Sequence, residues 1–152
     1  MGMRYQASAI DPTLADRLLA DPDDDLIDEL LDAGLDLDKM WHAAQIVLAG
    51  TMEAEEPLLT GQAVGDDMGY GPAVLALPPD VARVAASLES VTRAQLIARF
   101  DVADMRAQMA YPMVWDEDPD ELAAEVADAA MTLVDAYRQA AAQGHAILSA
   151  IT

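Results

Sequence analysis

Residues 118–151 give the clearest indication of the fold class, and they read DPDELAAEVADAAMTLVDAYRQAAAQGHAILSAI. Asp118 followed by Pro119 is typical of a helix N-terminus, because the aspartate can accept a backbone hydrogen bond and proline fits the first helical position. Apolar residues then recur with the 3.6-residue period of an amphipathic helix, at Leu122, Val126, Ala129, Leu133, Tyr137 and Ala140. Gly144 is expected to end this helix, and the apolar run 145–151 predicts a strand. The chain therefore combines a long helix with a sheet.

The rest of the chain predicts two further strands and several helices. We expect strands at 3–10 and 73–77, and helices at 12–20, 23–33, 78–88, 92–100 and 101–110. Another helix is expected to begin at Asp36 or Asp38 and to end at Gly50. Its uncharged run indicates a central helix that the rest of the fold surrounds. Gly34 is expected to close the helix before it as a left-handed cap.

Residues 51–72 show neither a helical nor a strand period, although glycine recurs in them at Gly61, Gly65, Gly69 and Gly71. A connection of this length indicates a functional loop, a mobile segment or an undetected element. Three short strands separated by helical blocks predict the α+β class. We expect a single domain over residues 1–152, with a small three-stranded mixed sheet covered by several helices and a long C-terminal helix.

The composition excludes several classes of protein. The 152 residues include 8 Lys and Arg, 28 Asp and Glu and no cysteine, which gives a net charge of −20. Without cysteine there can be no disulfide framework, thiolate zinc cluster or cysteine nucleophile. The longest uncharged stretch, 139–152, is shorter than the ~18 apolar residues of a membrane span, and the first residues lack the apolar core of a secretory signal. We therefore expect a soluble cytoplasmic protein with no membrane partner.

The negative charge is concentrated near the N-terminus. Between residues 11 and 38 only Arg17 opposes the following acids: Asp11, Asp16, Asp21, Asp23, Asp24, Asp25, Asp28, Glu29, Asp32, Asp36 and Asp38. Such a field argues against direct nucleic-acid binding and favours a basic protein partner, because complementary charges raise association rates. The alternative interpretation is solubility together with skewed residue usage, since the chain has no asparagine and a single lysine, Lys39.

Three segments carry a resemblance to a known family: 36–43 (DLDKMWHA), 65–73 (GDDMGYGPA) and 111–115 (YPMVW). They resemble the signature stretches of the YfbM-like family of small bacterial proteins, and the resemblance covers essentially the whole chain. It implies a single α+β domain in a bacterial cytosol. It implies no activity, because the family is known as a domain of unknown function. Some members are suspected of accompanying secreted toxins as immunity proteins, which adds an inhibitor role to the functions considered.

His42 is the first candidate for an acid, a base or a ligand. On a helix, Asp38 four residues before it and Gln45 three after it would share its face, and a carboxylate there would hold the imidazole charged or fix its tautomer. The alternative is that Asp38 caps the helix while His42 is a hydrogen-bonded, largely buried residue beside Trp41. An isolated histidine without a nucleophile at motif spacing is weak support for catalysis.

The glycine-rich loop 65–72 is the second candidate region. Its glycines permit positive φ angles, so the loop could present Asp67 and Tyr70 to a ligand or partner, or could fold over the sheet with Tyr70 packed beneath. Tyr111 and Trp115 join Trp41 as further candidates, because tyrosine and tryptophan are enriched in binding sites as well as in cores.

Sites for metals and phosphates have little support. The two histidines are far apart and lack the H-E-x-x-H spacing, so we expect no zinc and no other cofactor. A Mg²⁺ or Ca²⁺ site from Asp66 and Asp67 with the Asp36/Asp38 pair is left open. The glycines of loop 65–72 match neither phosphate-binding pattern, and no catalytic residue can be named.

The sequence thus predicts binding rather than catalysis. The preferred function is a cytoplasmic protein-binding module, in the form of an inhibitor or immunity-type partner of a basic protein. The alternative is a small-molecule-binding protein or small enzyme in which Asp38, His42 and the 65–72 loop converge on one pocket. A third interpretation is a homo-oligomer that uses residues 111–115. The candidate binding residues are Asp38, Trp41, His42, Asp67, Tyr70, Tyr111 and Trp115.

Overall fold

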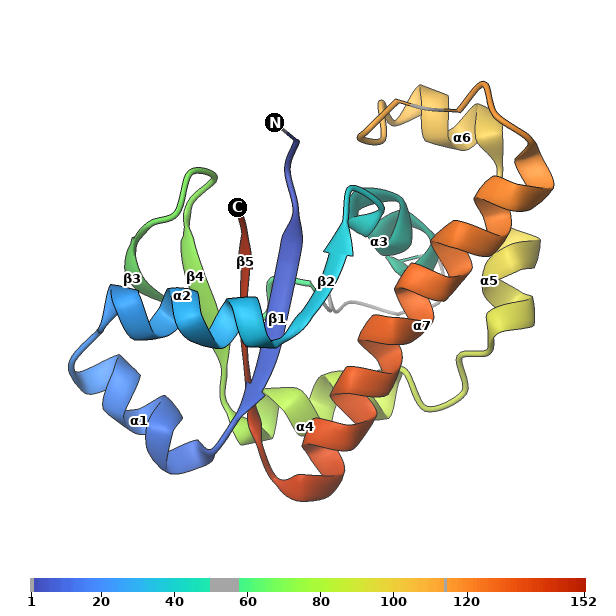
Figure 1. The fold of residues 1–152 in the computed structure, drawn as a ribbon. Coiled ribbons are helices and arrows are strands. Elements are labelled where there is room, and N and C mark those ends of the chain that lie inside the picture. The colour runs from blue at the N-terminus through green and yellow to red at the C-terminus, as the bar shows by residue number, and fades with distance from the viewer. Residues whose placement is uncertain (1, 50–57, 114) are drawn as a thin grey trace.

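A five-stranded sheet with helices on both faces forms the frame of the molecule (Figure 1). The computed structural model describes residues 2–49, 58–113 and 115–152. Its strands are β1 (Tyr5–Ile10), β2 (Leu35–Asp38), β3 (Gln62–Asp67), β4 (Pro72–Ala76) and β5 (Ala146–Ile151). Its helices are α1 (Pro12–Ala20), α2 (Asp24–Ala33), α3 (Trp41–Ala49), α4 (Pro78–Ser87), α5 (Arg93–Arg99), α6 (Val102–Ala107) and α7 (Pro119–Gln143). The predicted α+β class and the long C-terminal helix are confirmed.

The strand order in the sheet is β2-β1-β5-β4-β3, and each pair of neighbours in it is antiparallel. The three predicted strands are present as β1, β5 and β4, side by side in the middle of the sheet. The prediction of a three-stranded mixed sheet is nevertheless wrong. The sequence instead predicts a helix start at the position of β2 and an unpatterned loop at the position of β3.

Both edge strands are weakly encoded. In β2 (LDLD) the apolar and acidic residues alternate, but Asp36 and Asp38 also resemble helix caps. The structure places Asp38 at the end of this strand with a φ of 48°, and α3 begins only at Trp41. In β3 only Val64 is buried, so no alternating pattern marks the strand. The earlier part of the unpatterned stretch, residues 51–57, and the expected helix end at Gly50 lie outside the described residues.

Five of the predicted helix starts are confirmed by side-chain caps. In each of these helices a side-chain oxygen of the N-cap residue accepts a backbone N–H of the first turn. The N-cap residues are Asp11, Asp23, Thr92, Asp101 and Asp118. Thr92 and Gln95 form the expected capping box. At the other end of α7, Gly144 adopts the predicted left-handed conformation with a φ of 68°. Helix α6 is shorter than expected and ends at Ala107.

The predicted left-handed cap at Gly34 is wrong. Gly34 has an extended backbone, with φ −88° and ψ −160°. A Cβ atom at this position would overlap the carbonyl oxygen of Ala7 and would lie 3.0 Å from the Cβ of Ser8. Glycine is therefore needed because the end of α2 approaches the backbone of β1 closely, and not because of a positive φ angle.

The sheet separates two apolar cores. Alternate residues of β5 point to opposite faces, so that Leu148 packs with Leu18 and Ile27 of α1 and α2, while Ile147 packs with the residues of α3–α7. Figure 1 shows α1 and α2 on one side of the sheet and the other helices on the other side. Helices α1 and α2, with the sheet edge beside them, therefore form a thin layer of their own.

Helix α7, rather than α3, is central to the larger layer. It packs against α3, α4 and α5. Helix α3 buries one face only, including Val47 and Leu48, while Trp41, His42 and Gln45 stay half-buried. Within residues 2–49, 58–113 and 115–152, no helix is both long and apolar enough to cross a bilayer.

Candidate functional site

The carboxylates of the thin layer form one acidic face. We define the acidic face as the carboxylates between residues 11 and 32 together with Asp66 and Asp67 of β3, and each of these residues is exposed. The members between 11 and 32 are Asp11, Asp16, Asp21, Asp23, Asp24, Asp25, Asp28, Glu29 and Asp32. Arg17 is the one basic residue in that part of the sequence. The acidic segment of the sequence thus becomes one side of the molecule.

A few members of the acidic face have structural roles. Asp11 and Asp23 cap α1 and α2, and Asp32 accepts a hydrogen bond from the Gln6 side chain at 3.2 Å. Other members, such as Asp25 and Asp28, have neither a hydrogen bond nor an ion pair within the described part of the chain. Asp25 lies in the first turn of α2, where the helix dipole favours a carboxylate, whereas Asp28 lies beyond that turn.

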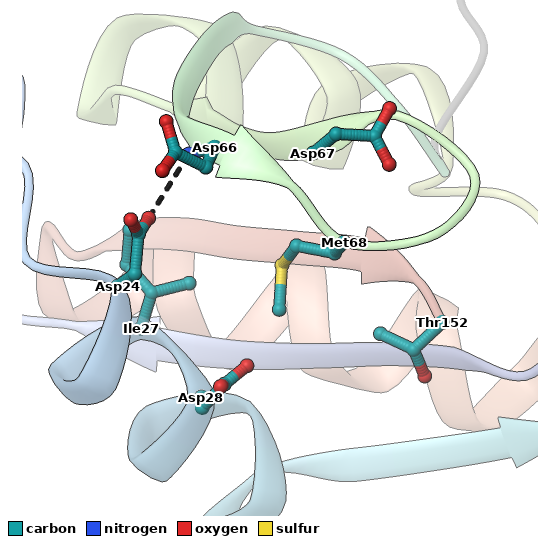
Figure 2. Close-up of a pocket in the computed structure, with 7 residues that line it drawn as sticks. All are labelled: Asp24, Ile27, Asp28, Asp66, Asp67, Met68 and Thr152. Atoms are coloured by element: carbon teal, nitrogen blue, oxygen red, sulfur yellow. Dashed lines mark hydrogen bonds between the residues drawn. The ribbon is translucent and has the colours of Figure 1, made fainter.

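A hollow of about 380 Å³ lies between α2 and the hairpin formed by β3 and β4. Its walls are four aspartates, Asp24 and Asp28 from α2 and Asp66 and Asp67 from the hairpin. Figure 2 shows the Met68 side chain between the hairpin and α2, near Ile27. We call this space the acidic hollow. It combines carboxylates at its rim with apolar surface within it.

One hydrogen bond joins the two walls of the acidic hollow. The carboxylate oxygen Oδ1 of Asp24 accepts the backbone N–H of Asp66 at 2.9 Å, as the dashed line in Figure 2 marks. The approach requires glycine beside it, because a Cβ at Gly65, whose φ is 77°, would lie 2.5 Å from the same oxygen. The helix predicted at 23–33 includes Asp24, but the sequence does not predict this contact. The two residues are 42 positions apart, so no local sequence signal marks the contact.

The hairpin turn holds Tyr70 in the solvent. Oδ1 of Asp67 accepts the N–H of Gly69 at 2.7 Å, and the N–H of Met68 donates to the carbonyl of Gly71 at 2.9 Å. The Tyr70 side chain is 57% exposed, so it is presented by the loop and not packed beneath it. A second hollow of about 510 Å³ lies beside it, and we call it the tyrosine hollow. Its lining residues are Gly2, Arg4, Met68, Gly69, Tyr70 and Thr152.

Three of the candidate residues meet on the other side of the sheet. Nδ1 of His42 accepts the backbone N–H of Tyr111 at 3.0 Å, although the two residues are 69 positions apart. The rings of Trp41 and His42 are stacked with centroids 5.2 Å apart, and the Tyr111 ring lies 6.4 Å from that of Trp41. We call these three side chains the aromatic cluster. The geometry supports the structural interpretation of His42, as a hydrogen-bonded residue beside Trp41.

The candidates Trp115 and Asp38 belong neither to the hollows beside the hairpin nor to the aromatic cluster. Trp115 is 3% exposed, donates its Nε1–H to the carbonyl of Ala110 at 2.9 Å and is part of the core. Asp38 lies on β2 and shares no helix face with His42. Its own N–H donates to Oδ1 of Asp36 at 2.7 Å.

The structure does not bring Asp38 and the 65–72 loop into one pocket. Asp38 is on β2 and the loop adjoins β3, and these strands are opposite edges of the sheet. Neighbouring strands are about 4.8 Å apart, which separates the two edges by roughly 19 Å. The carboxylate metal site that would combine Asp36 and Asp38 with Asp66 and Asp67 is excluded for the same reason. Among the residues that the structure describes, no three His, Asp or Glu side chains are grouped to hold a metal ion.

Comparisons with known proteins agree with this architecture. A family model described as "Domain of unknown function (DUF1877)" matches residues 1–150. A solved structure, described as that of a protein of unknown function, YfbM from Escherichia coli, has 26% sequence identity and a TM-score of 0.72. The match covers 99% of this chain and 100% of that chain. A search of curated proteins gave no match.

Proposed function

The chain belongs to the DUF1877 family, whose description assigns no activity, and we therefore propose from the geometry alone that it is a protein-binding module for a basic partner. One observation carries the proposal. The acidic face gathers exposed carboxylates on the layer formed by α1, α2 and the edge of the sheet, and Arg17 is the one basic residue in the sequence between residues 11 and 32, which holds nine carboxylates.

The chemistry of this face favours a partner of opposite charge. Carboxylates that have no cation beside them repel one another, and a basic surface relieves that repulsion while it steers the two proteins together. Phosphate groups would be repelled by the same field, which argues against a nucleic acid. An inhibitor or immunity-type protein that covers a basic site on its target is one form that such a module would take. The proposal keeps the cytoplasmic location expected from the sequence.

The small-molecule alternative has less support from the geometry. It needed Asp38, His42 and the loop in one pocket, whereas Asp38 and the loop adjoin opposite edges of the sheet and His42 lies on α3. His42 also uses Nδ1 to hold the backbone of Tyr111.

The proposal can be tested by capturing partners from a native cell lysate at two salt concentrations, with the purified protein as bait and mass spectrometry as the readout. We expect a basic protein in stoichiometric amount at low salt and its loss at high salt, because salt screens charges on exposed surfaces. The proposal would be overturned if the partner were captured equally at low and high salt, or if no partner were captured at either concentration.

A further inference from the structure

The acidic hollow and the tyrosine hollow are adjacent. Both are lined by Met68 and Thr152, so that together they form one groove along the tip of the β3–β4 hairpin. Asp28 and Asp66 lie at one end of this groove, and the exposed ring of Tyr70 lies at the other. The groove thus has an acidic end and an apolar, aromatic end.

The basic residue at the groove does not cancel the charge of its acidic end. Arg4 lines the tyrosine hollow, but its guanidinium donates to the carboxylate of Asp36 on β2, with Nε 3.1 Å from Oδ2. In the acidic hollow, Asp24 and Asp67 accept backbone N–H groups, whereas Asp28 and Asp66 have no hydrogen-bonded or ion-paired side chain within the described residues. Two carboxylates are therefore available to a ligand.

We propose that this groove binds an extended segment of the basic partner, with a lysine or arginine side chain in the acidic hollow and an apolar side chain against Met68 and Tyr70. This inference rests on the proposed function, and it specifies where the partner binds and through which side chains. A long basic side chain fits the acidic hollow, because its methylene stem can cover Ile27 and Met68 while its charged end reaches the carboxylates.

The spacing within the partner follows from the geometry of an extended chain. Residues i and i+2 of a strand point to the same side and are about 7 Å apart. We therefore place the basic side chain at position i and the apolar side chain at position i+2, so that both point into the groove. Tyrosine offers a large contact area at a small loss of conformational entropy, which makes the Tyr70 end suitable for an apolar anchor.

The probe for this proposal is the N-acetylated, C-amidated tripeptide arginyl-alanyl-leucine, added to isotope-labelled protein while the amide NMR spectrum is recorded. We expect saturable shifts at Asp28 and in residues 66–70, with a Kd of about 1 mM. A tripeptide with glutamate in place of arginine is expected not to bind. A tripeptide with serine in place of leucine is expected to bind about fivefold more weakly, because one apolar contact is lost.

Two pairs of substitutions, each removing two negative charges, distinguish binding in the groove from a general effect of the negative charge on the acidic face. The pair Asp28→Asn and Asp66→Asn is expected to weaken tripeptide binding about fivefold. The pair Asp16→Asn and Glu29→Gln alters the same acidic face outside the groove and is expected to leave binding nearly unchanged. Tyr70→Ala is expected to abolish the preference for leucine over serine.

Several outcomes would overturn the inference. One is an absence of shifts, another is shifts spread over α1 and over the residues of α2 that do not line the groove, and a third is an equal effect of the two pairs. Shifts of the groove residues on concentrating the protein alone would show that a second copy occupies the groove. In each of these cases the rest of the acidic face is still available to the basic partner, so the lysate experiment tests the proposed function separately.

Discussion

The imidazole of His42 joins two parts of the chain that are far apart in sequence. It lies in the first turn of α3, and its Nδ1 accepts the backbone N–H of Tyr111 at 3.0 Å. That hydrogen bond requires an unprotonated Nδ1. The segment that it holds includes Met109 and Met113, which have φ angles of 49° and 70° and are exposed by 73% and 59%. Positive φ angles are uncommon in methionine, so the segment depends on contacts of this kind.

The variant His42→Phe measures the value of this contact. Phenylalanine keeps a ring beside Trp41 but removes the acceptor, which leaves the Tyr111 N–H without its partner. We expect the free energy of unfolding to fall by about 1 kcal/mol in urea denaturation. His145→Gln is the control, because His145 makes no side-chain hydrogen bond within the described residues, and its effect is expected to stay within about 0.5 kcal/mol. Equal effects of the two variants would contradict the assigned role.

Two buried tyrosines predict a loss of stability at high pH. Burial raises the pKa of Tyr5 well above its ordinary value of 10.0, and burial also raises the pKa of Tyr137. Both side chains stay protonated in the folded protein at a pH where the unfolded chain ionises. The unfolded state then binds fewer protons, so the free energy of unfolding falls as the pH rises above about 10.

The variant Tyr5→Phe tests this pH dependence. It removes the hydrogen bond from the Tyr5 hydroxyl to the carbonyl of Leu58, 2.7 Å long, and is expected to cost about 1 kcal/mol at neutral pH. Its stability is expected to fall less steeply above pH 10 than that of the natural chain. Ser149→Ala is the matched control, because Ser149 donates to the same carbonyl and does not titrate in this range. If both variants show the slope of the natural chain, the role of Tyr5 is wrong.

At the scale of elements, the sequence predicts those whose signals do not depend on distant contacts. The helix starts at Asp11, Thr92 and Asp118 were predictable, because the cap residue and the first turn are neighbours in the chain. The buried strand β5 was predictable from its continuous apolar run. The edge strands β2 and β3 were not, since each buries few residues and is defined by the strand beside it.

The candidate site was predictable only in parts, for the same reason. The loop with Asp67 and Tyr70 was identified, but the α2 wall that completes its hollow was not, because the contact of Asp24 with Asp66 spans 42 positions. Trp41, His42 and Tyr111 were named separately, and only the fold brings them together.

The junction of α2 with β1 provides a test at this scale. In Gly34→Ala the new methyl group would overlap the carbonyl oxygen of Ala7, which is part of the sheet backbone and cannot move freely. We expect a loss of at least about 2 kcal/mol in the free energy of unfolding, measured by chemical denaturation. Gly144→Ala is the comparison, because its φ of 68° is unfavourable for alanine but the site is open, and about 1 kcal/mol is expected. A smaller effect at Gly34 than at Gly144 would contradict the steric explanation.

At the scale of the whole molecule, the charge is divided between two sides. The acidic face covers α1, α2 and β3, while exposed acids such as Glu121 and Glu125 lie on α7 across the sheet. The net charge of the chain does not distinguish these two sides. The proposed function requires that the basic partner bind the acidic face and not the side that carries α7. Of the residues 111–115, considered above for self-association, Trp115 lies in the core and Met113 is 59% exposed.

The most direct test compares two variants, each with four carboxylates neutralised on one of these two sides of the molecule. It measures how much of the basic partner each variant captures. One variant carries Asp16→Asn, Asp25→Asn, Asp28→Asn and Glu29→Gln on α1 and α2. The other carries Glu117→Gln, Asp120→Asn, Glu121→Gln and Glu125→Gln at the start of α7. Both change the net charge from −20 to −16, since each removes four negative charges. We predict that the first variant loses most of the captured partner and the second retains it, whereas equal loss or equal retention would contradict the assignment of binding to the acidic face.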